Sequence, residues 1–414
     1  MKDTTKMKSL TKLYLKKAKS KHANIIIPGS KSESNRLIIL SSLFENIYFE
    51  NISNSDDTNY LLNAINTKSK VINVGHAGTS IRFLTSYIAL TTQVDIQLIG
   101  SKRMHNRPIK ILVDSLRQIG ASIEYLDKEG YPPILIRPAK LYAKKLQIDK
   151  SKSSQYISSL LLIAPKIEGG LEIELVGRET STPYIDMTIS LLKKIGVRII
   201  SRSNYFRVYE SQNINNIKVH IDSDWSSASY FYSIVAMSEI GYSLVLSKFN
   251  IKSLQGDSAV TEIYKQFGVK TIHIGEKIKL EKIKSDISEF SMDMSSNPDL
   301  AQTICVTCLG LGVKCYLTGL HTLKIKETDR LLALSNELCK FGLKVKITSD
   351  SISFTNKATL MPDIMVDTYD DHRMAMSFAC LAMKTNIIIC NPQVVTKSYN
   401  SFWLDLEKIG ISSQ

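Results

Sequence analysis

The stretch Pro28–Arg36, with the sequence PGSKSESNR, gathers hydroxyl and cationic side chains where a helix is expected to start. Ser30 and Glu33 have the spacing of a capping box, so we expect the helix to begin at Lys31. First-turn amides carry the positive end of the helix dipole and favour phosphate or carboxylate. The plainer interpretation is a capped surface helix, and a phosphate-binding P-loop fits poorly because its earlier glycine is missing. Other stretches of the sequence must decide between an anion site and a capped surface helix.

Five further stretches place glycine, serine or charged residues near the start of an expected helix. They are 75–82 (GHAGTSIR), 103–108 (RMHNRP), 153–155 (SSQ), 326–330 (KETDR) and 370–376 (DDHRMAM). Pro108 suits the first position of a helix. We expect Lys326 and Arg330 to share one helical face, with Asp329 inward or capping. Capping or solvated ion pairs explain each stretch taken alone, and only their combination indicates a site.

Length and composition indicate a globular protein of two to four domains. The chain has 414 residues, 43% of them hydrophobic, and no apolar run near the roughly 20 residues that span a bilayer. Residues 1–21 are lysine-rich, lack a signal-peptide core and are expected to form a short frayed leader. We therefore expect a cytoplasmic protein with no membrane partner.

The formal charge of +14 indicates acidic partners, either nucleic acid or small anions. A nucleic-acid binder concentrates its cations in a stripe with interleaved aromatic residues. Here the lysines are spread along the whole length, so small anions are the better expectation.

Cys305 and Cys308 form a C-x-x-C pair, which allows a redox or zinc interpretation. They lie inside the apolar run 300–311, and no second pair has zinc-ribbon spacing. Reduced cysteines in a core are the better prediction, and no metal site is expected.

A repeated pattern of amphipathic helix, glycine and β-branched strand recurs along the chain. Its glycines are Gly120, Gly196, Gly268 and Gly342, with a partial fifth at Gly410, and they are separated by 76, 72, 74 and 68 residues. Glycine is typical just after a helix. Units of about 72 residues would number close to six, and a unit this long holds several strands and helices. We therefore predict an α/β fold of repeated units.

Hydrophobic periodicity supplies further elements. Strands are expected at 25–27, 94–99, 134–136, 171–175, 244–246, 352–354 and 387–390. Helices are expected at 35–44, 80–90, 108–118, 156–164, 185–194, 226–237 and 373–383.

The motifs together carry a family resemblance. In order they are PGSKSESNR, AGT, RPI, SSQ, PYID, DWSSASY, QGD, KETDRL and DHRMAM. From about Leu13 to the C-terminus the chain resembles the 5-enolpyruvylshikimate-3-phosphate synthases, also called 3-phosphoshikimate 1-carboxyvinyltransferases. The sister family, the UDP-N-acetylglucosamine enolpyruvyl transferases, shares the fold but not the KETDR signature.

The resemblance implies two domains, 30–222 and 1–29 plus 223–414, each of three βαβαββ units, with the active site in the cleft between them. It implies transfer of the enolpyruvyl group of phosphoenolpyruvate to the 5-hydroxyl of shikimate 3-phosphate, with release of phosphate by addition and elimination. The pathway is the shikimate route to chorismate and the aromatic amino acids. The resemblance implies a monomer that needs no cofactor, and this enzyme class is the target of glyphosate.

The resemblance also assigns residues. Phosphoenolpyruvate is expected to meet Lys31, Gly78, Arg107, Gln155, Arg330, Arg373 and Lys397. Shikimate 3-phosphate is expected to meet Lys31, Ser32, Arg36, Ser153, Ser154, Gln155, Ser181, Tyr184, Asp299, Thr322 and Lys326. Asp299 matches the proton acceptor for the 5-hydroxyl and Glu327 the proton donor to the methylene carbon, with Lys31 also catalytic. Seven cations against two carboxylates account for the absence of a metal requirement.

Three positions depart from the family pattern. His76 stands where the family usually has asparagine, Phe83 where proline is common, and Thr322 where asparagine normally contacts the sugar phosphate. Catalysis is expected to survive these changes, whereas glyphosate sensitivity does not follow from the sequence. Two alternatives remain open: an enolpyruvyl transferase that acts on a nucleotide sugar, and a basic nucleic-acid-binding protein built on related repeats.

Overall fold

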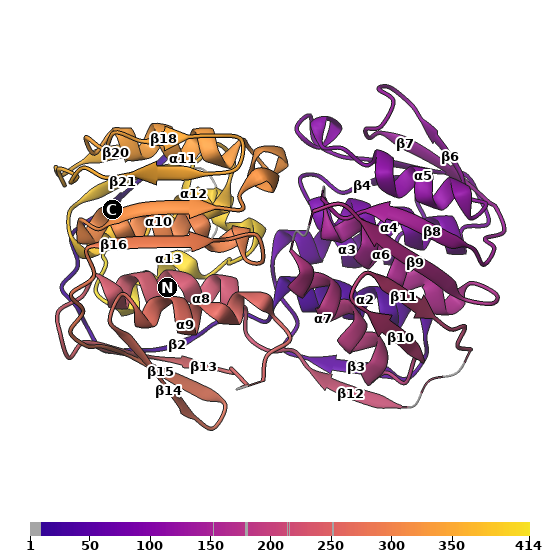
Figure 1. Cartoon of the computed structure of the whole chain (residues 1–414), viewed down its shortest axis with the longest axis horizontal. Helices are drawn as coiled ribbons and strands as arrows, with labels where there is room; N and C mark the ends of the chain where they lie inside the picture. Colours follow the sequence, from indigo (N-terminus) through magenta and orange to yellow (C-terminus); the bar gives the residue numbers. More distant parts are fainter. Residues whose placement is uncertain (1–9, 152, 179–180, 213, 215, 251) are drawn as a thin grey trace. The chain divides into compact units, whose positions relative to one another are not determined.

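The structure, a computed structural model, describes residues 10–151, 153–178, 181–212, 214, 216–250 and 252–414. Helices and strands alternate along the chain, which confirms the predicted α/β class. Internal contacts divide the chain into two compact units (Figure 1). Unit 1 joins the N-terminal segment up to Pro28 to Asp222–Gln414, and unit 2 is Gly29–Ile221. The division into domains 30–222 and 1–29 plus 223–414, with three repeats in each, stays a prediction.

Unit 2 contains three sheets among its described residues. In order across each sheet, the strands are β12 (Ile217–His220) and β3 (Ile47–Glu50); β4 (Val71–Asn73), β5 (Ile96–Ile99), β7 (Ile134–Arg137) and β6 (Ser122–Tyr125); and β8 (Lys145–Asp149), β9 (Leu171–Val176), β11 (Tyr205–Val208) and β10 (Ile199–Arg202). The helices are α2 (Lys31–Leu43), α3 (Asp56–Asn66), α4 (Gly78–Thr91), α5 (Lys110–Gln118), α6 (Ser154–Ile163) and α7 (Thr182–Lys194), with short 3-10 helices η1 (Met104–Asn106) and η2 (Ala164–Lys166).

Unit 1 also contains three sheets within its described part. In order, the strands are β1 (Lys12–Leu15), β21 (Ile387–Cys390) and β20 (Ile364–Val366); β2 (Asn24–Ile26), β13 (Ser243–Ser247), β15 (Lys277–Lys282) and β14 (Val269–Ile274); and β16 (Glu289–Asp293), β17 (Lys314–Thr318), β19 (Ile352–Phe354) and β18 (Lys346–Ile347). The α-helices are α8 (Trp225–Ala236), α9 (Val260–Lys265), α10 (Ala301–Leu311), α11 (Arg330–Cys339), α12 (His372–Ala379) and α13 (Phe402–Lys408). The 3-10 helices are η3 (Gly256–Ala259), η4 (Pro298–Leu300), η5 (His321–Ile325), η6 (Cys380–Met383) and η7 (Pro392–Lys397).

The four-stranded sheets share one topology. In each, the first two strands are parallel, and the remaining two continue the sheet antiparallel in the order first, second, fourth, third. Helices lie against the sheets in both units (Figure 1). This recurring topology agrees with the spacing of the repeat in the sequence.

Three mutually contacting helices form the centre of each unit: α2, α4 and α6 in unit 2, and α8, α10 and α12 in unit 1. Small hydroxyl side chains join the unit 1 helices at equivalent positions. Thr303 Oγ1 lies 3.4 Å from Ser229 Oγ and 3.2 Å from Ser377 Oγ, and each pair is 74 residues apart. The repeat interval therefore reappears as the separation of contacting residues in the core.

The repeat glycines follow helices as predicted. Gly120 lies just beyond α5 with φ +107°, and Gly196 just beyond α7 with φ +95°. This left-handed conformation is disfavoured for residues with a Cβ, which explains the glycine at the end of each helix.

Three local predictions are wrong. Residues 12–15 are not part of a frayed leader, because alternation buries Leu13 and Leu15 as β1 pairs with β21; residues 1–9 lie outside the described part. Pro108 does not open a helix, since α5 begins at Lys110. Lys326 and Arg330 do not share a helical face: Asp329 caps α11 in an extended conformation, so the preceding residues leave the helix axis.

The C-x-x-C cysteines pack in the unit 1 core, as predicted. Cys305 and Cys308 are completely buried, and Cys305 Sγ lies 4.0 Å from Cys315 Sγ without a disulfide. Burial is the main cause that raises the pKa of the Cys305 and Cys308 thiols. Within the described ranges no cluster of His, Cys, Asp and Glu has the arrangement of a metal site, and no helix is long and apolar enough to cross a membrane.

Candidate active site

The predicted site residues gather near the N-terminal ends of the central helices in each unit. In unit 1, Asp299 precedes α10 and Arg373 lies in the first turn of α12. In unit 2, Lys31 opens α2, Gly78 opens α4 and Ser153 caps α6. Helix N-termini favour anions through their free amides and dipoles, so both sets stand where anionic substrates are favoured.

Arg330 is the centre of the unit 1 cluster. Its side chain is only 2% exposed, and its three nitrogens meet three carboxylates: Nε lies 2.5 Å from Asp371 Oδ2, Nη1 lies 2.9 Å from Asp299 Oδ1, and Nη2 lies 2.8 Å from Glu327 Oε2. Burial acts to lower the pKa of Arg330, but attraction to Asp371, Glu327 and Asp299 outweighs it and raises the pKa overall. The guanidinium is therefore fixed in orientation and permanently charged.

Asp299 is surrounded by cations. Besides Arg330, Arg373 Nη2 lies 3.1 Å from its Oδ2, and Lys326 Nζ lies 3.4 Å from its Oδ1. Burial acts to raise the pKa of Asp299, but Arg373, Lys326 and Arg330 together hold it well below the usual range. The carboxylate is therefore ionised at neutral pH and able to accept a hydrogen bond.

Lys397 and Thr322 complete the predicted set in unit 1. Lys397 is 3% exposed, and its Nζ lies 3.6 Å from Glu327 Oε1. Thr322 lies in η5 and is 5% exposed; within the described part of the chain its Oγ1 has no hydrogen-bond partner. A buried hydroxyl without a partner is costly, which favours a role in binding a ligand.

A second layer holds Arg373 in place. Arg373 Nη2 donates to Ser226 Oγ at 3.4 Å, and Ser226 in turn donates to Asp257. Asp257 Oδ1 also accepts from Asn297 Nδ2 at 3.3 Å. Asp257 is 2% exposed, and burial raises its pKa despite the nearby Arg373.

The start of α2 in unit 2 has the predicted cap. Ser30 Oγ accepts a hydrogen bond from the Glu33 amide at 3.3 Å, and the helix begins at Lys31. Lys31 Nζ lies 3.2 Å from Asp57 Oδ2, which is 2% exposed and belongs to α3. This ion pair fixes the Lys31 ammonium beside the N-terminus of α2.

Gly78 and Arg107 are brought together. A Cβ added to Gly78 would meet the guanidinium of Arg107, with Cζ only 2.6 Å away. Gln155 lies close to the same helix start, because its Nε2 donates to Thr79 Oγ1 at 3.1 Å. The predicted phosphoenolpyruvate contacts Gly78, Arg107 and Gln155 thus belong to the neighbouring N-termini of α4 and α6 and the loop before α5.

Six residues assigned to shikimate 3-phosphate in unit 2 lie in or just before α2, α6 and α7. Ser32, Arg36 and Tyr184 are joined, because Arg36 donates to the Ser32 carbonyl at 2.8 Å and to the Tyr184 carbonyl at 3.0 Å. Ser153 caps α6 by accepting from the Gln155 amide, and the next residue, Ser154, is buried. Ser181, just before α7, is 7% exposed and has φ +51°. A left-handed serine is strained, and such strain is common at functional sites.

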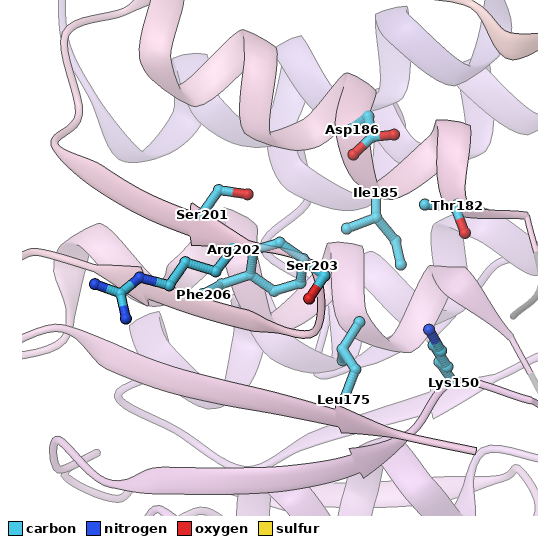
Figure 2. A pocket seen from close by; sticks show the side chains of 9 residues that line it. All are labelled: Lys150, Leu175, Thr182, Ile185, Asp186, Ser201, Arg202, Ser203 and Phe206. Carbon is cyan, nitrogen blue, oxygen red and sulfur yellow. The ribbon is translucent and has the colours of Figure 1, made fainter. Parts of the chain in front are cut away.

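A cavity of about 180 Å³ also lies in unit 2. Its lining residues are Lys150, Leu175, Thr182, Ile185, Asp186, Ser201, Arg202, Ser203 and Phe206. Figure 2 shows the Arg202 guanidinium extending away from the other labelled side chains. None of these residues is a predicted site residue, so the cavity shares no lining residue with the predicted site.

A protein-family model matches most of the chain. The model described as EPSP synthase (3-phosphoshikimate 1-carboxyvinyltransferase) matches residues 61–406. The chain belongs to the EPSP synthase family. The matched range includes Asp299 and the two arginines that contact it, Arg330 of the KETDR motif and Arg373 of the DHRMAM motif.

Relatives of this EPSP synthase family member extend over nearly its whole length. The 3-phosphoshikimate 1-carboxyvinyltransferase of Bacteroides fragilis (strain YCH46) is 39% identical over 402 residues, which cover 96% of this chain and 98% of the relative. That of Histophilus somni (strain 2336) is 34% identical over 434 residues, which cover 97% and 99%. An EPSP synthase structure from Acinetobacter baumannii has a TM-score of 0.79 at 20% identity and covers 98% of this chain and 99% of its own, which shows a shared fold.

Sequence reasoning missed the carboxylates that hold the cations of this EPSP synthase family member. Asp371 anchors Arg330, Asp57 anchors Lys31, and Asp257 supports Arg373 through Ser226. Asp371 stood in a motif that was singled out, and its capping position before α12 was a usable signal. Asp57 is also in the first turn of a helix, but nothing local indicates which lysine it meets.

Proposed function

We propose that this member of the EPSP synthase family transfers the enolpyruvyl group of phosphoenolpyruvate to the 5-hydroxyl of shikimate 3-phosphate and releases phosphate. The observation that carries the proposal is the unit 1 cluster, in which Arg330, Arg373 and Lys326 surround the ionised Asp299. Both substrates are polyanions, so the reaction needs fixed cations with a carboxylate among them. The curated names of the relatives support the same reaction.

Phosphoenolpyruvate is assigned to five cations. The side chains that would bind its charged groups are those of Lys31, Arg107, Arg330, Arg373 and Lys397. Bidentate guanidinium groups suit phosphate and carboxylate, and the carboxylates that orient them keep their N–H groups aimed. The remaining contacts come from two uncharged residues, Gly78 and Gln155.

Shikimate 3-phosphate is assigned to hydroxyl and cationic groups. The proposed contacts are Lys31, Ser32, Arg36, Ser153, Ser154, Gln155, Ser181, Tyr184, Asp299, Thr322 and Lys326. The buried Thr322 hydroxyl, which has no hydrogen-bond partner among the described residues, supports this assignment because a ligand could satisfy it. The left-handed Ser181 supports it because backbone strain clusters at functional sites.

The proton transfers are assigned to two carboxyl groups. Glu327 pairs with Arg330 and Lys397 without substrate, and substrate anions that engage these cations would let it take up a proton. Protonated Glu327 would then protonate the methylene carbon of phosphoenolpyruvate, and the 5-hydroxyl would attack C2 while Asp299 accepts its proton. In the second step the new methyl group returns a proton to the Glu327 carboxylate, the C–H electrons restore the double bond, and the C2–O bond to phosphate breaks. The proton held by Asp299 would pass to the departing phosphate, which restores both carboxyl groups to their starting states. Substrate anions that engage Arg330 and Arg373 would weaken their hold on Asp299, and this would raise its basicity for the first step.

The proposal includes a monomer that acts in the cytoplasm without a metal or cofactor. Fixed ammonium and guanidinium groups supply the charge stabilisation that a metal would otherwise provide. Gel filtration with light scattering would test the monomer, since a dimer mass at working concentration contradicts it.

The test of the proposed function is acceptor dependence. Phosphate release from phosphoenolpyruvate is measured with shikimate 3-phosphate, with UDP-N-acetylglucosamine and with neither. We expect release only with shikimate 3-phosphate. Release only with the nucleotide sugar would instead favour the sister reaction, and RNA binding without any turnover would favour the nucleic-acid alternative.

A further inference from the structure

Arg36 lies at a junction of helices in unit 2 and donates only to neutral groups. On α2, its Nη1 donates to the Ser32 carbonyl at 2.8 Å. Its Nε donates to Thr188 Oγ1 on α7 at 2.7 Å, and its Nη2 to Ser158 Oγ on α6 at 3.1 Å and to the Tyr184 carbonyl at 3.0 Å. A guanidinium has five N–H donors, so these four bonds leave one donor, on Nη1, for another partner.

The charge of Arg36 has no contacting counter-ion. The residue is 2% exposed, and no carboxylate of the described residues lies within 4.0 Å of its guanidinium. Burial lowers its pKa to about 10, against weaker opposing attraction to Tyr184 and Glu33. Buried charges are normally paired, so a buried cation held only by neutral acceptors is suited to receive an anion.

Phe83 covers this cation from a fourth helix. Its ring, on α4, is 1% exposed, and the ring centroid lies 5.3 Å from Arg36 Cζ. The negative face of an aromatic ring attracts a guanidinium without competing for its N–H groups. The ring therefore stabilises the charge while the remaining donor stays available.

We propose that Phe83 is a positioning residue for shikimate 3-phosphate: its ring holds the Arg36 guanidinium in place, charged and ready to bind an anionic group of that substrate. The inference rests on the proposed function, in which Arg36 contacts shikimate 3-phosphate. Phe83 is not among the predicted substrate contacts. Its ring meets the flat face of the Arg36 guanidinium, which makes no hydrogen bonds.

The test compares Phe83→Leu with wild type. Leucine keeps apolar bulk but removes the ring quadrupole, so we expect the Kd for shikimate 3-phosphate, measured by calorimetry, to rise about tenfold. The KM for phosphoenolpyruvate and kcat at saturation should stay within about twofold. Phe206→Leu is the matched control, because Phe206 is a buried phenylalanine of β11 in the same unit; its Kd should be unchanged.

A double-mutant cycle separates this inference from the proposed function. If Phe83 acts through Arg36, Phe83→Leu should cause no further loss in an Arg36→Met background. Additive losses, or an unchanged Kd in Phe83→Leu beside a weakened Arg36→Met, overturn the inference alone. An unchanged Kd in Arg36→Met refutes the assignment of Arg36 in the proposed function. If Phe83→Leu does not fold, Phe83→Met replaces it, since methionine fills irregular space.

Discussion

The anchoring of Arg330 by Asp371 makes a quantitative prediction for Asp371→Asn. Asp371 is fully buried, meets Arg330 Nε at 2.5 Å, and also caps α12 by accepting from the Arg373 amide at 2.8 Å. Asparagine keeps the shape and, through its Oδ1, the cap, but it removes the charge and places an Nδ2 donor where Oδ2 accepts from Arg330 Nε. The variant therefore removes both the charge and the acceptor that one carboxylate contributes to the cluster.

The size of the effect follows from the remaining partners. Removing one partner of a buried ion pair costs about 3–5 kcal/mol. Arg330 keeps Asp299 and Glu327, at 2.9 and 2.8 Å, so we expect a smaller loss of about 2–3 kcal/mol in the free energy of unfolding. A domain stable by roughly 5–15 kcal/mol should still fold.

Tryptophan fluorescence during urea unfolding is the assay, because the only two tryptophans, Trp225 and Trp403, are buried in unit 1 with the cluster. Asp286→Asn is the control, since its partner Lys284 is 76% exposed and such surface pairs contribute little. A midpoint for Asp371→Asn equal to that of Asp286→Asn would refute the reasoning.

Three further predictions follow from the site. Gly78→Ala should push the Arg107 guanidinium aside and raise the KM for phosphoenolpyruvate at least tenfold, with little change for shikimate 3-phosphate; steady-state kinetics showing equal changes would contradict this. The pKa of Asp299 is lower in the folded protein than in the unfolded chain, where it is near 4, so the ionised carboxylate stabilises the fold above about pH 4 and this stability is lost as the pH falls through the folded-state pKa. In Asp299→Asn, the unfolding midpoint should therefore fall less steeply with decreasing pH below about pH 4. A pH dependence equal to that of wild type would count against this. Dialysis against EDTA should leave phosphate release unchanged, and loss of activity restored by a divalent metal would reverse the proposal of a metal-free reaction.

Much of the fold was predictable because local signals govern it. The repeat glycines marked helix ends through the backbone conformation they permit, and hydrophobic periodicity located five of the six central helices. The sixth, α10, was not predicted as a helix, because its residues are buried on every side and show only as the continuous apolar run 300–311. The capping box of Ser30 and Glu33 placed the start of α2 correctly for the same reason. The predicted leader failed at β1 because its pairing partner, β21, lies at the other end of the chain.

The candidate site was predictable as a list of residues but not as a network. Arg330 and Asp371 are 41 residues apart, and Arg36 and Thr188 are 152 apart, so no local pattern joins them. The KETDR stretch looked helical because Lys326 and Arg330 are four residues apart. The capping preference of Asp329 prevailed, and Lys326 reaches Asp299 from a loop instead.

The central claim is that fixed cations make two polyanions react, and Lys31 tests it most directly. Phosphate release from phosphoenolpyruvate with saturating shikimate 3-phosphate is compared for wild type, Lys31→Met and the exposed-lysine control Lys110→Met, after each variant is shown to unfold like wild type. The account predicts a loss of about a hundredfold or more for Lys31→Met and none for Lys110→Met. A Lys31→Met rate close to that of wild type would contradict it.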